Sequence, residues 1–123
     1  MDRKKILIVE DDRSLLKILT EKFANEGYDI SEAVNGEEGL EKALSLKPDL
    51  ILLDILMPVM DGMTMLRELR KHEAGKNIPV MVLTNLSDPQ KALEATEVQV
   101  FDYLVKSDWK LEDVVDKVQK KLE

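Results

Sequence analysis

Cysteine is absent from this chain of 123 residues, and histidine occurs once, at His72. The lack of cysteine excludes disulfides, thiolate nucleophiles and cysteine-ligated zinc or iron centres. No apolar run approaches the roughly 20 residues that a membrane-spanning helix needs. The first apolar run, Ile6 to Val9, is also too short for the apolar core of a signal peptide. We therefore expect a cytoplasmic protein that has no contact with a membrane.

Positive charge is also scarce, because 18 Lys and Arg residues stand against 25 Asp and Glu residues, which gives a net charge of −7. This balance argues against nucleic-acid binding by this domain, since such binding depends on clustered basic side chains. It leaves a protein partner possible. The length and the lack of a linker-like stretch predict one domain, residues 1–123, with no effector domain within this chain. Both a stand-alone regulator and a receiver domain cut from a longer protein fit this prediction.

Apolar runs of strand length alternate with segments of helical periodicity. The expected strands are Ile6–Val9, Tyr28–Val34, Leu50–Leu53, Val80–Leu83 and a fifth strand whose core is Tyr103–Val105. The expected helices are Arg13–Glu26, Glu37–Leu46, Met63–Glu73, a short one that begins at Pro89, and a last one with an apolar stripe from Leu111 to Leu122. Parallel neighbours need a crossover, usually a helix, so this alternation predicts an α/β fold with a doubly wound parallel sheet.

Several single residues have structural explanations. Gly27 is placed to end the first helix, and Asn35 to cap the second. His72 is expected to be a solvated residue at the end of a helix. Four of the six methionines, at positions 57, 60, 63 and 65, are expected to pack around the third loop and helix.

Polar or charged residues follow four of the five expected strands: Glu10-Asp11-Asp12, Asp54, Thr84 and Lys106. Each has an ordinary explanation alone, since Asp12 could cap a helix and Asp54 could begin a turn. Ligands of open α/β sheets, however, bind at the carboxyl ends of the strands. We therefore take these residues together as the candidate site.

Three of these four carboxylates together with one ammonium would leave a net charge of −2, which a divalent cation would neutralise. The offered ligands are all oxygens, so a hard cation is favoured, Mg²⁺ first and Mn²⁺ as a second candidate. One carboxylate could then act as a nucleophile towards phosphorus. Lys106 and Thr84 could stabilise the charge on the oxygens of a transferring phosphoryl group.

These residues carry a family resemblance that extends over essentially the whole chain. The matching pieces are Ile6-Leu7-Ile8-Val9-Glu10-Asp11-Asp12, Asp49-Leu50-Ile51-Leu52-Leu53-Asp54, Met57-Pro58 with Asp61-Gly62, Val82-Leu83-Thr84, and Asp102-Tyr103-Leu104-Val105-Lys106. In this order, the chain resembles the CheY-like receiver domain of two-component response regulators. The resemblance implies a flavodoxin-like fold of five parallel strands in the order 2-1-3-4-5, with five helices. It also implies phosphorylation of Asp54 by a histidine kinase or a histidine phosphotransfer protein.

The same resemblance assigns roles to individual residues. It implies that Asp11, Asp12 and Asp54 bind Mg²⁺, with help from the backbone carbonyl of Leu56. Lys106 would bind a phosphoryl oxygen. Thr84 would turn its hydroxyl towards the phosphoryl group, and Tyr103 would follow it inward. These movements would remodel the face formed by the fourth helix, the fifth strand and the fifth helix, where a downstream protein would bind.

The chain departs from the family pattern at positions that bear on this site. Ser107 stands where proline usually follows the lysine, so we expect a trans Lys106-Ser107 bond, since a cis bond there costs about 2.5–4 kcal/mol. Asn85 stands where a small residue is common, and it could narrow access to Asp54 or face solvent. Leu56 and Leu86 cannot orient an attacking water, which predicts slow decay of the phosphorylated form.

Two other functions fit parts of this pattern. An aspartate-nucleophile phosphatase would also use Mg²⁺, but such enzymes usually carry a D-x-D motif after the first strand, and this chain does not. A phosphorylation-independent binding module on the same fold would not need the full set of acids, threonine and lysine. The sequence therefore favours a phosphoacceptor switch rather than an enzyme that turns over a substrate.

Overall fold

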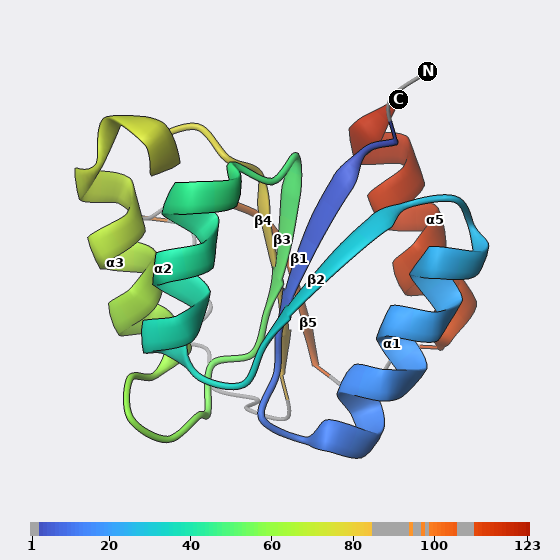
Figure 1. The fold of residues 1–123 in the computed structure, drawn as a ribbon, viewed down its shortest axis with the longest axis horizontal. Helices are drawn as coiled ribbons and strands as arrows, with labels where there is room; N and C mark the ends of the chain where they lie inside the picture. The colour runs from blue at the N-terminus through green and yellow to red at the C-terminus, as the bar shows by residue number, and fades with distance from the viewer. Residues whose placement is uncertain (1–2, 85–93, 95–96, 98, 106–109) are drawn as a thin grey trace.

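A computed structural model describes residues 3–84, 94, 97, 99–105 and 110–123. Five strands form one parallel sheet in the order β2-β1-β3-β4-β5 (Figure 1). The strands are β1 (Lys5–Val9), β2 (Asp29–Ala33), β3 (Leu50–Leu53), β4 (Val80–Thr84) and β5 (Val100–Val105). The fold class and the strand order expected from the sequence are confirmed.

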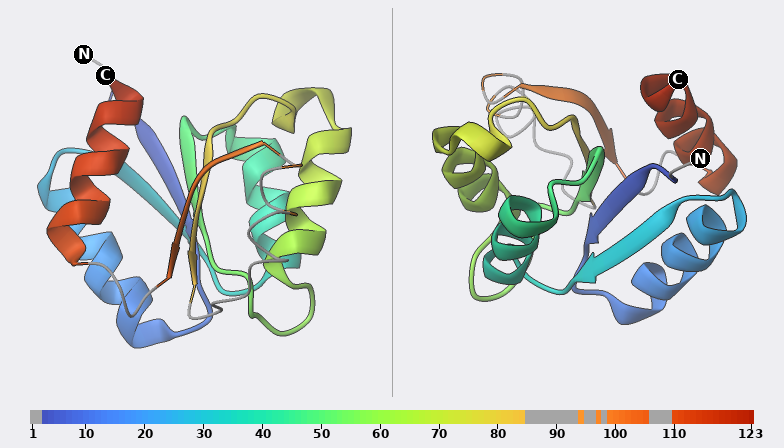
Figure 2. Two further views of the ribbon diagram at one scale, coloured as in Figure 1. Left: turned by 180° about the vertical axis from the view of Figure 1, so that it is seen from behind. Right: turned by 45° about the horizontal axis from the view of Figure 1, so that its top comes forward.

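Helices cover both faces of this sheet. The described helices are α1 (Arg13–Asn25), α2 (Gly36–Leu46), α3 (Gly62–Lys71), the short 3-10 helix η1 (Glu73–Gly75) and α5 (Leu111–Leu122). Helices α1 and α5 lie on one face, and α2 and α3 lie on the other (Figure 2). The helix expected from Pro89 falls mostly outside the described residues, although Glu94 and Glu97 have helical conformation.

The central strands are apolar along their whole length because each of their faces is buried under helices. In β1, Ile6 and Ile8 belong to the core beneath α1 and α5, whereas Leu7 and Val9 belong to the core beneath α2 and α3. Each of these four side chains is at most 1% exposed. An uninterrupted apolar run is the pattern of a parallel strand that is covered on both faces.

Both predicted helix caps are present. Gly27 has φ of +96° just after α1. Its amide donates to Ala24, and the amide of Tyr28 donates to Phe23. The rings of Phe23 and Tyr28 lie 6.0 Å apart, which completes the apolar contact of a Schellman motif. The side chain of Asn35 accepts from the amide of Glu38 at the start of α2.

Two elements differ from the expected ranges by more than one residue. Helix α3 ends at Lys71 rather than Glu73, because His72 adopts an extended conformation and a 3-10 turn follows. Strand β5 begins at Val100 rather than Tyr103, because pairing with β4 starts at Val80 and continues past an irregularity before Asp102. Pairing between distant segments decides the second boundary, and local composition does not reveal it. Within the described ranges, none of the helices has the length and apolar character needed to cross a lipid bilayer.

Candidate functional site

Pairing of β1 with β3 sets two acidic residues side by side. Val9 pairs with Leu53, and the amide of Asp54 donates to the carbonyl of Val9 at 3.0 Å. Glu10, the next residue after Val9, therefore stands beside Asp54 at the carboxyl edge of the sheet. The amide of Glu10 donates to Ala33 of β2 at 2.9 Å, which holds this strand end in place.

Three carboxylates converge at this edge. One oxygen from each of Glu10, Asp11 and Asp54 can be chosen so that all three lie within 4.8 Å of one another. Glu10 is 2% exposed and Asp54 is 5% exposed, whereas Asp11 is exposed to solvent. The group is therefore a mostly buried acidic cluster with one open side. Its donors are all carboxylate oxygens, which fit a hard divalent cation.

Asp12 is not a member of this cluster, contrary to the sequence analysis. Its Oδ1 accepts hydrogen bonds from the amides of Ser14 at 3.0 Å and Leu15 at 3.2 Å, as the N-cap of α1. Glu10 occupies the place expected for Asp12. The sequence held a signal for this arrangement, because a helix that begins at Arg13 needs a cap at the residue before it.

The carboxylate of Glu10 also supports the turn into α1. Its Oε2 accepts from the amide of Asp12 at 3.1 Å. Glu10 thus links the strand end, the acidic cluster and the helix cap. Its place in the strand-end motif Glu10-Asp11-Asp12 did not by itself mark it as a ligand.

Thr84 ends β4 and is fully buried. It pairs with Val105, the last residue of β5, so the threonine and the end of β5 reach the same edge as the acids. Lys106 follows Val105 directly, but Lys106, Ser107, Asn85 and Leu86 lie outside the described residues. The predictions for those four positions remain untested.

Tyr103 lies in β5 opposite Val82. It is partly exposed and packs against a small apolar cluster of Ile55, Met63 and Val82. Ile55 follows Asp54 in the chain, so this apolar cluster lies between the acidic cluster and the edge strand β5.

The loop between β3 and α3 packs closely against Asp54 of the acidic cluster. The amide of Leu56 lies 3.4 Å from Oδ1 of Asp54, and the Leu56 side chain is 55% exposed. The amide of Gly62 donates to the carbonyl of Ile55 at 2.9 Å. A Cβ atom at Gly62 would lie 2.1 Å from the backbone oxygen of Asp54, so only glycine allows this approach. The four methionines noted above pack around this loop and α3, as predicted.

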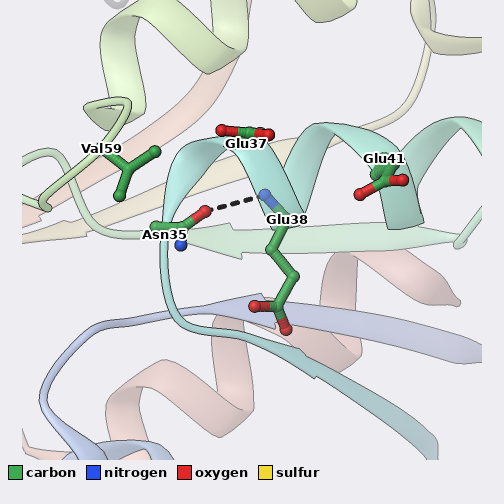
Figure 3. A pocket seen from close by; sticks show the side chains of 5 residues that line it. All are labelled: Asn35, Glu37, Glu38, Glu41 and Val59. Atoms are coloured by element: carbon green, nitrogen blue, oxygen red, sulfur yellow. Dashed lines mark hydrogen bonds between the residues drawn. The ribbon is translucent and has the colours of Figure 1, made fainter.

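A separate surface pocket lies at the start of α2. It measures about 340 Å³ and is lined by Asn35, Glu37, Glu38, Glu41 and Val59 (Figure 3). Val59 is 75% exposed and has φ of +69°, which is unusual for a β-branched residue. None of these residues belongs to the acidic cluster, so the pocket is distinct from the candidate site.

Comparison with known families agrees with this geometry. A model of the response regulator receiver domain matches residues 6–119. The chain belongs to the response regulator receiver domain family. It is a phosphoacceptor signalling module of the kind found in two-component systems. The match spans every described strand apart from Lys5, the first residue of β1.

Two of the curated relatives of this receiver domain are named as transcriptional regulators. The chain is 37% identical over 102 residues to the DNA-binding dual master transcriptional regulator RpaA of Synechocystis, covering 83% of this chain and 42% of that protein. It is 36% identical over 103 residues to the alkaline phosphatase synthesis transcriptional regulatory protein PhoP of Bacillus subtilis, with coverage of 84% and 42%. The receiver domain thus spans less than half the length of these two relatives.

Solved structures share the fold along nearly the whole chain. A CheY-like receiver domain protein from Methanospirillum hungatei matches with a TM-score of 0.91 and 26% identity, covering 98% of this chain and 94% of that one. The CheX–CheY complex with beryllofluoride and magnesium from Borrelia burgdorferi matches with a TM-score of 0.86 and 29% identity, with coverage of 98% and 90%.

Proposed function

We propose that Asp54 is the phosphoacceptor of this receiver domain. The observation that carries the proposal is the position of its carboxylate, which is nearly buried at the end of β3 within 4.8 Å of carboxylate oxygens from Glu10 and Asp11. Thr84 ends the neighbouring strand β4 at the same edge. A nucleophile, a cation site and a hydroxyl are the parts that phosphoryl transfer to a carboxylate requires.

The reaction is a transfer between two side chains. An oxygen of Asp54 attacks the phosphorus of a phosphohistidine on a kinase or a phosphotransfer protein. A new P–O bond forms, the P–N bond breaks, and the histidine nitrogen leaves with the electron pair. The product is an acyl phosphate on Asp54, whose later hydrolysis restores the carboxylate.

Mg²⁺ is the proposed cofactor, with Mn²⁺ as a substitute. Glu10, Asp11 and Asp54 would hold it, together with the backbone carbonyl of Leu56. The ion would neutralise negative charge on the transferring group. Asp12 is left to cap α1. Lys106, the first residue after β5, would bind a phosphoryl oxygen.

Thr84 and Tyr103 are the proposed switch residues. Thr84 would turn its hydroxyl towards the phosphoryl group, and Tyr103 would move with it. Tyr103 already packs against the apolar cluster that begins next to Asp54. Its movement would change the face formed by the segment before β5, by β5 and by α5. We assign a downstream protein partner to that face.

The similarity to the receiver domain family supports a proposal for the wider role. We propose that residues 1–123 form one receiver domain that works in the cytoplasm and contacts neither nucleic acid nor membrane itself. Its phosphodonor is a histidine kinase or histidine phosphotransfer protein. It assists its own phosphorylation and dephosphorylation but turns over no separate substrate.

We also propose that the phosphorylated form decays slowly. The side chain of Leu56 is apolar and 55% exposed beside the site, and Leu86 is apolar as well. Neither can orient a water for attack on phosphorus. Replacing Leu86 with Glu should speed the loss of label from purified phosphoprotein, and Asn85→Ala tests whether that neighbour limits access. Rapid decay in the unchanged protein that Leu86→Glu does not alter would contradict the proposal.

The central test is labelling with a small phosphodonor, followed by mass spectrometry, with Mg²⁺ present or chelated. The unchanged protein should gain one phosphoryl group only when Mg²⁺ is present. Asp54→Asn should gain none, because an amide is a poor nucleophile. Asp49→Asn, a change at an acid just before β3, is the matched control and should be labelled normally.

The same experiment separates the alternatives. If neither the unchanged protein nor Asp54→Asn responds to Mg²⁺ or to the phosphodonor, a phosphorylation-independent binding module is favoured. Repeated turnover of small phosphoesters would favour an aspartate-nucleophile phosphatase. Labelling of Asp54→Asn at the same level would exclude Asp54 as the acceptor.

A further inference from the structure

Strand β2 stands at one end of the sheet, so only one of its two sides is paired. Its partner is β1, and within the described ranges no other strand pairs with it (Figure 1). The amide of Asp29 donates to the residue just before β1, and the carbonyl of Ala33 accepts from the residue just after β1. Because strand residues direct their backbone groups to alternate sides, Ile30 and Glu32 direct theirs away from β1. The outer side of β2 is therefore an open edge.

The open edge of β2 lacks two features by which an edge strand often excludes another strand. Its sequence, Asp29 to Ala33, contains no proline. Its pairing with β1 keeps one register from end to end, without a bulge. The outward-facing amides and carbonyls of such a strand can pair with a strand of another molecule. Whether they do so depends on the side chains around the edge.

Lys42 of α2 reaches this open edge. Its Nζ donates to the backbone carbonyl of Glu32 and lies 3.3 Å from Oε1 of Glu38, one turn earlier on α2. From the other face of the sheet, the hydroxyl of Thr20 on α1 donates to the carboxylate of Glu32 at 2.7 Å. Side chains from α1 and α2 thus hold Glu32 from both faces, and the contact of Lys42 is with the outward-facing backbone.

A second copy of this chain carries an edge that fits this one. In an antiparallel pair of β2 strands, Ile30 of each copy could stand opposite Glu32 of the other, and both residues direct their backbone groups outward. Asp29 would then stand opposite Ala33, so like charges would not meet directly. Such a pair is symmetric, as most contacts between identical chains are. It requires the carbonyl of Glu32 to accept from an amide of the second copy, and Lys42 occupies that carbonyl.

We propose that Lys42 closes the open edge of β2 to a second copy of this chain. Its ammonium occupies the backbone acceptor that the second copy needs. It also places a charge at the edge that would have to leave water if another strand covered it. This role involves neither Asp54 nor phosphoryl transfer, so it can be tested independently of the proposed function.

Removing the ammonium should allow the edges to pair. Lys42→Ala should raise the association constant for dimers about five- to twenty-five-fold above that of the unchanged protein. The reason is that the two copies no longer give up the Lys42 hydrogen bond, and one such bond contributes a factor of about five. Sedimentation equilibrium over a range of protein concentrations measures this constant. Lys42→Arg keeps a cationic donor and should behave like the unchanged protein.

Glu38→Gln is the matched control. It breaks the ion pair on α2 but leaves Lys42 to donate to Glu32. It also brings the net charge of −7 one unit closer to zero, whereas Lys42→Ala moves it one unit further away. General charge repulsion therefore predicts stronger association in Glu38→Gln and weaker association in Lys42→Ala. The proposed role predicts an increase in Lys42→Ala and none in Glu38→Gln. An association constant in Lys42→Ala no larger than that in Glu38→Gln would overturn it.

Amide hydrogen exchange locates the contact between copies. In Lys42→Ala, exchange at Ile30 and Glu32 should slow as the protein concentration rises, because these amides become bonded in the pair. In the unchanged protein, exchange at these two positions should stay constant over the same concentrations. Stronger association of Lys42→Ala without slower exchange at Ile30 and Glu32 would mean that another face pairs, and the proposed role of Lys42 would be wrong.

Discussion

Asp11 and Asp12 are adjacent in the sequence and identical in chemistry, yet the structure gives them different surroundings. The carboxylate of Asp11 lies close to those of Glu10 and Asp54, whereas the carboxylate of Asp12 accepts hydrogen bonds from two backbone amides of α1. The difference arises because the chain turns from strand to helix between them. At the residue scale, position relative to that turn decides which acid can bind an ion.

This assignment predicts different effects for substitutions at the helix cap and in the acidic cluster. Asp12→Ala should lower the free energy of unfolding by about 1 kcal/mol, the usual cost of losing an N-cap, and leave Mg²⁺ affinity unchanged. Glu10→Gln and Asp11→Asn should weaken Mg²⁺ binding, because each removes a charged ligand. Urea unfolding and calorimetric Mg²⁺ titration of the three variants provide the comparison. Loss of Mg²⁺ binding in Asp12→Ala would contradict this assignment and show that Asp12 is a metal ligand.

Tyr28 provides a prediction about pH. Burial raises the pKa of its hydroxyl, and the negative charges of Glu26 and Glu123 raise it further. Because the folded pKa is the higher one, the stability contributed by neutral Tyr28 is complete below the unfolded value, about 10. That stability is lost as pH rises through the folded pKa.

Absorbance titration of the phenol should therefore give a midpoint for Tyr28 above that of an unfolded tyrosine. Subtracting the curve of Tyr28→Phe isolates this group, because the only other tyrosine is Tyr103. Tyr28→Phe should also remove part of the loss of stability at alkaline pH. A midpoint at or below the unfolded value would show that the ring is more hydrated than the structure indicates.

At the scale of elements, the loop after β3 is built around a glycine. An added Cβ at Gly62 would meet the backbone of Asp54 and Ile55 at 2.1 and 2.9 Å. The clash involves backbone atoms, which cannot rotate away as a flexible side chain could. The start of α3 is thereby held against the residue that we assign as the phosphoacceptor.

Gly62→Ala should consequently lower the free energy of unfolding by about 1–3 kcal/mol, the range typical of overpacking, and should weaken Mg²⁺ binding. Ser45→Ala, on the exposed side of α2, is a control that should change neither property. Thermal unfolding and Mg²⁺ titration give both readouts. Normal Mg²⁺ affinity in Gly62→Ala would mean that the loop can shift without moving Asp54.

The elements differ in how well the sequence predicts their boundaries. Helix α1 was predictable, because its apolar spacing, its cap and Gly27 all agree. The start of β5 was not, because it depends on pairing with β4 and on an irregularity that no local pattern encodes. The end of α3 was missed for a related reason. The turn that follows is held by hydrogen bonds from Arg70 to the carbonyls of Gly75 and Ile78.

At the scale of the whole molecule, a bound ion should stabilise the fold, because the acidic cluster that we propose as its site exists only when β1 and β3 are paired. Mg²⁺ at 100 times its dissociation constant would add about 2.7 kcal/mol to the free energy of unfolding. Melting temperature should rise with Mg²⁺ and return on addition of a chelator. Asp11→Asn should show a smaller rise. An equal rise in both proteins would place the effect outside this cluster.

The sequence by itself determined the α/β class and the order of the elements, and it placed the candidate site at the strand ends. Those conclusions follow from periodicity and from the residues that stand directly after each apolar run, which are properties of local sequence. Only the tertiary structure decided that Glu10, rather than Asp12, accompanies Asp11 and Asp54. It also showed that α3 contacts the residue before β5, because Arg70 donates to the carbonyl of Gln99. Both results depend on which distant segments become neighbours, and that is set by strand register and helix packing.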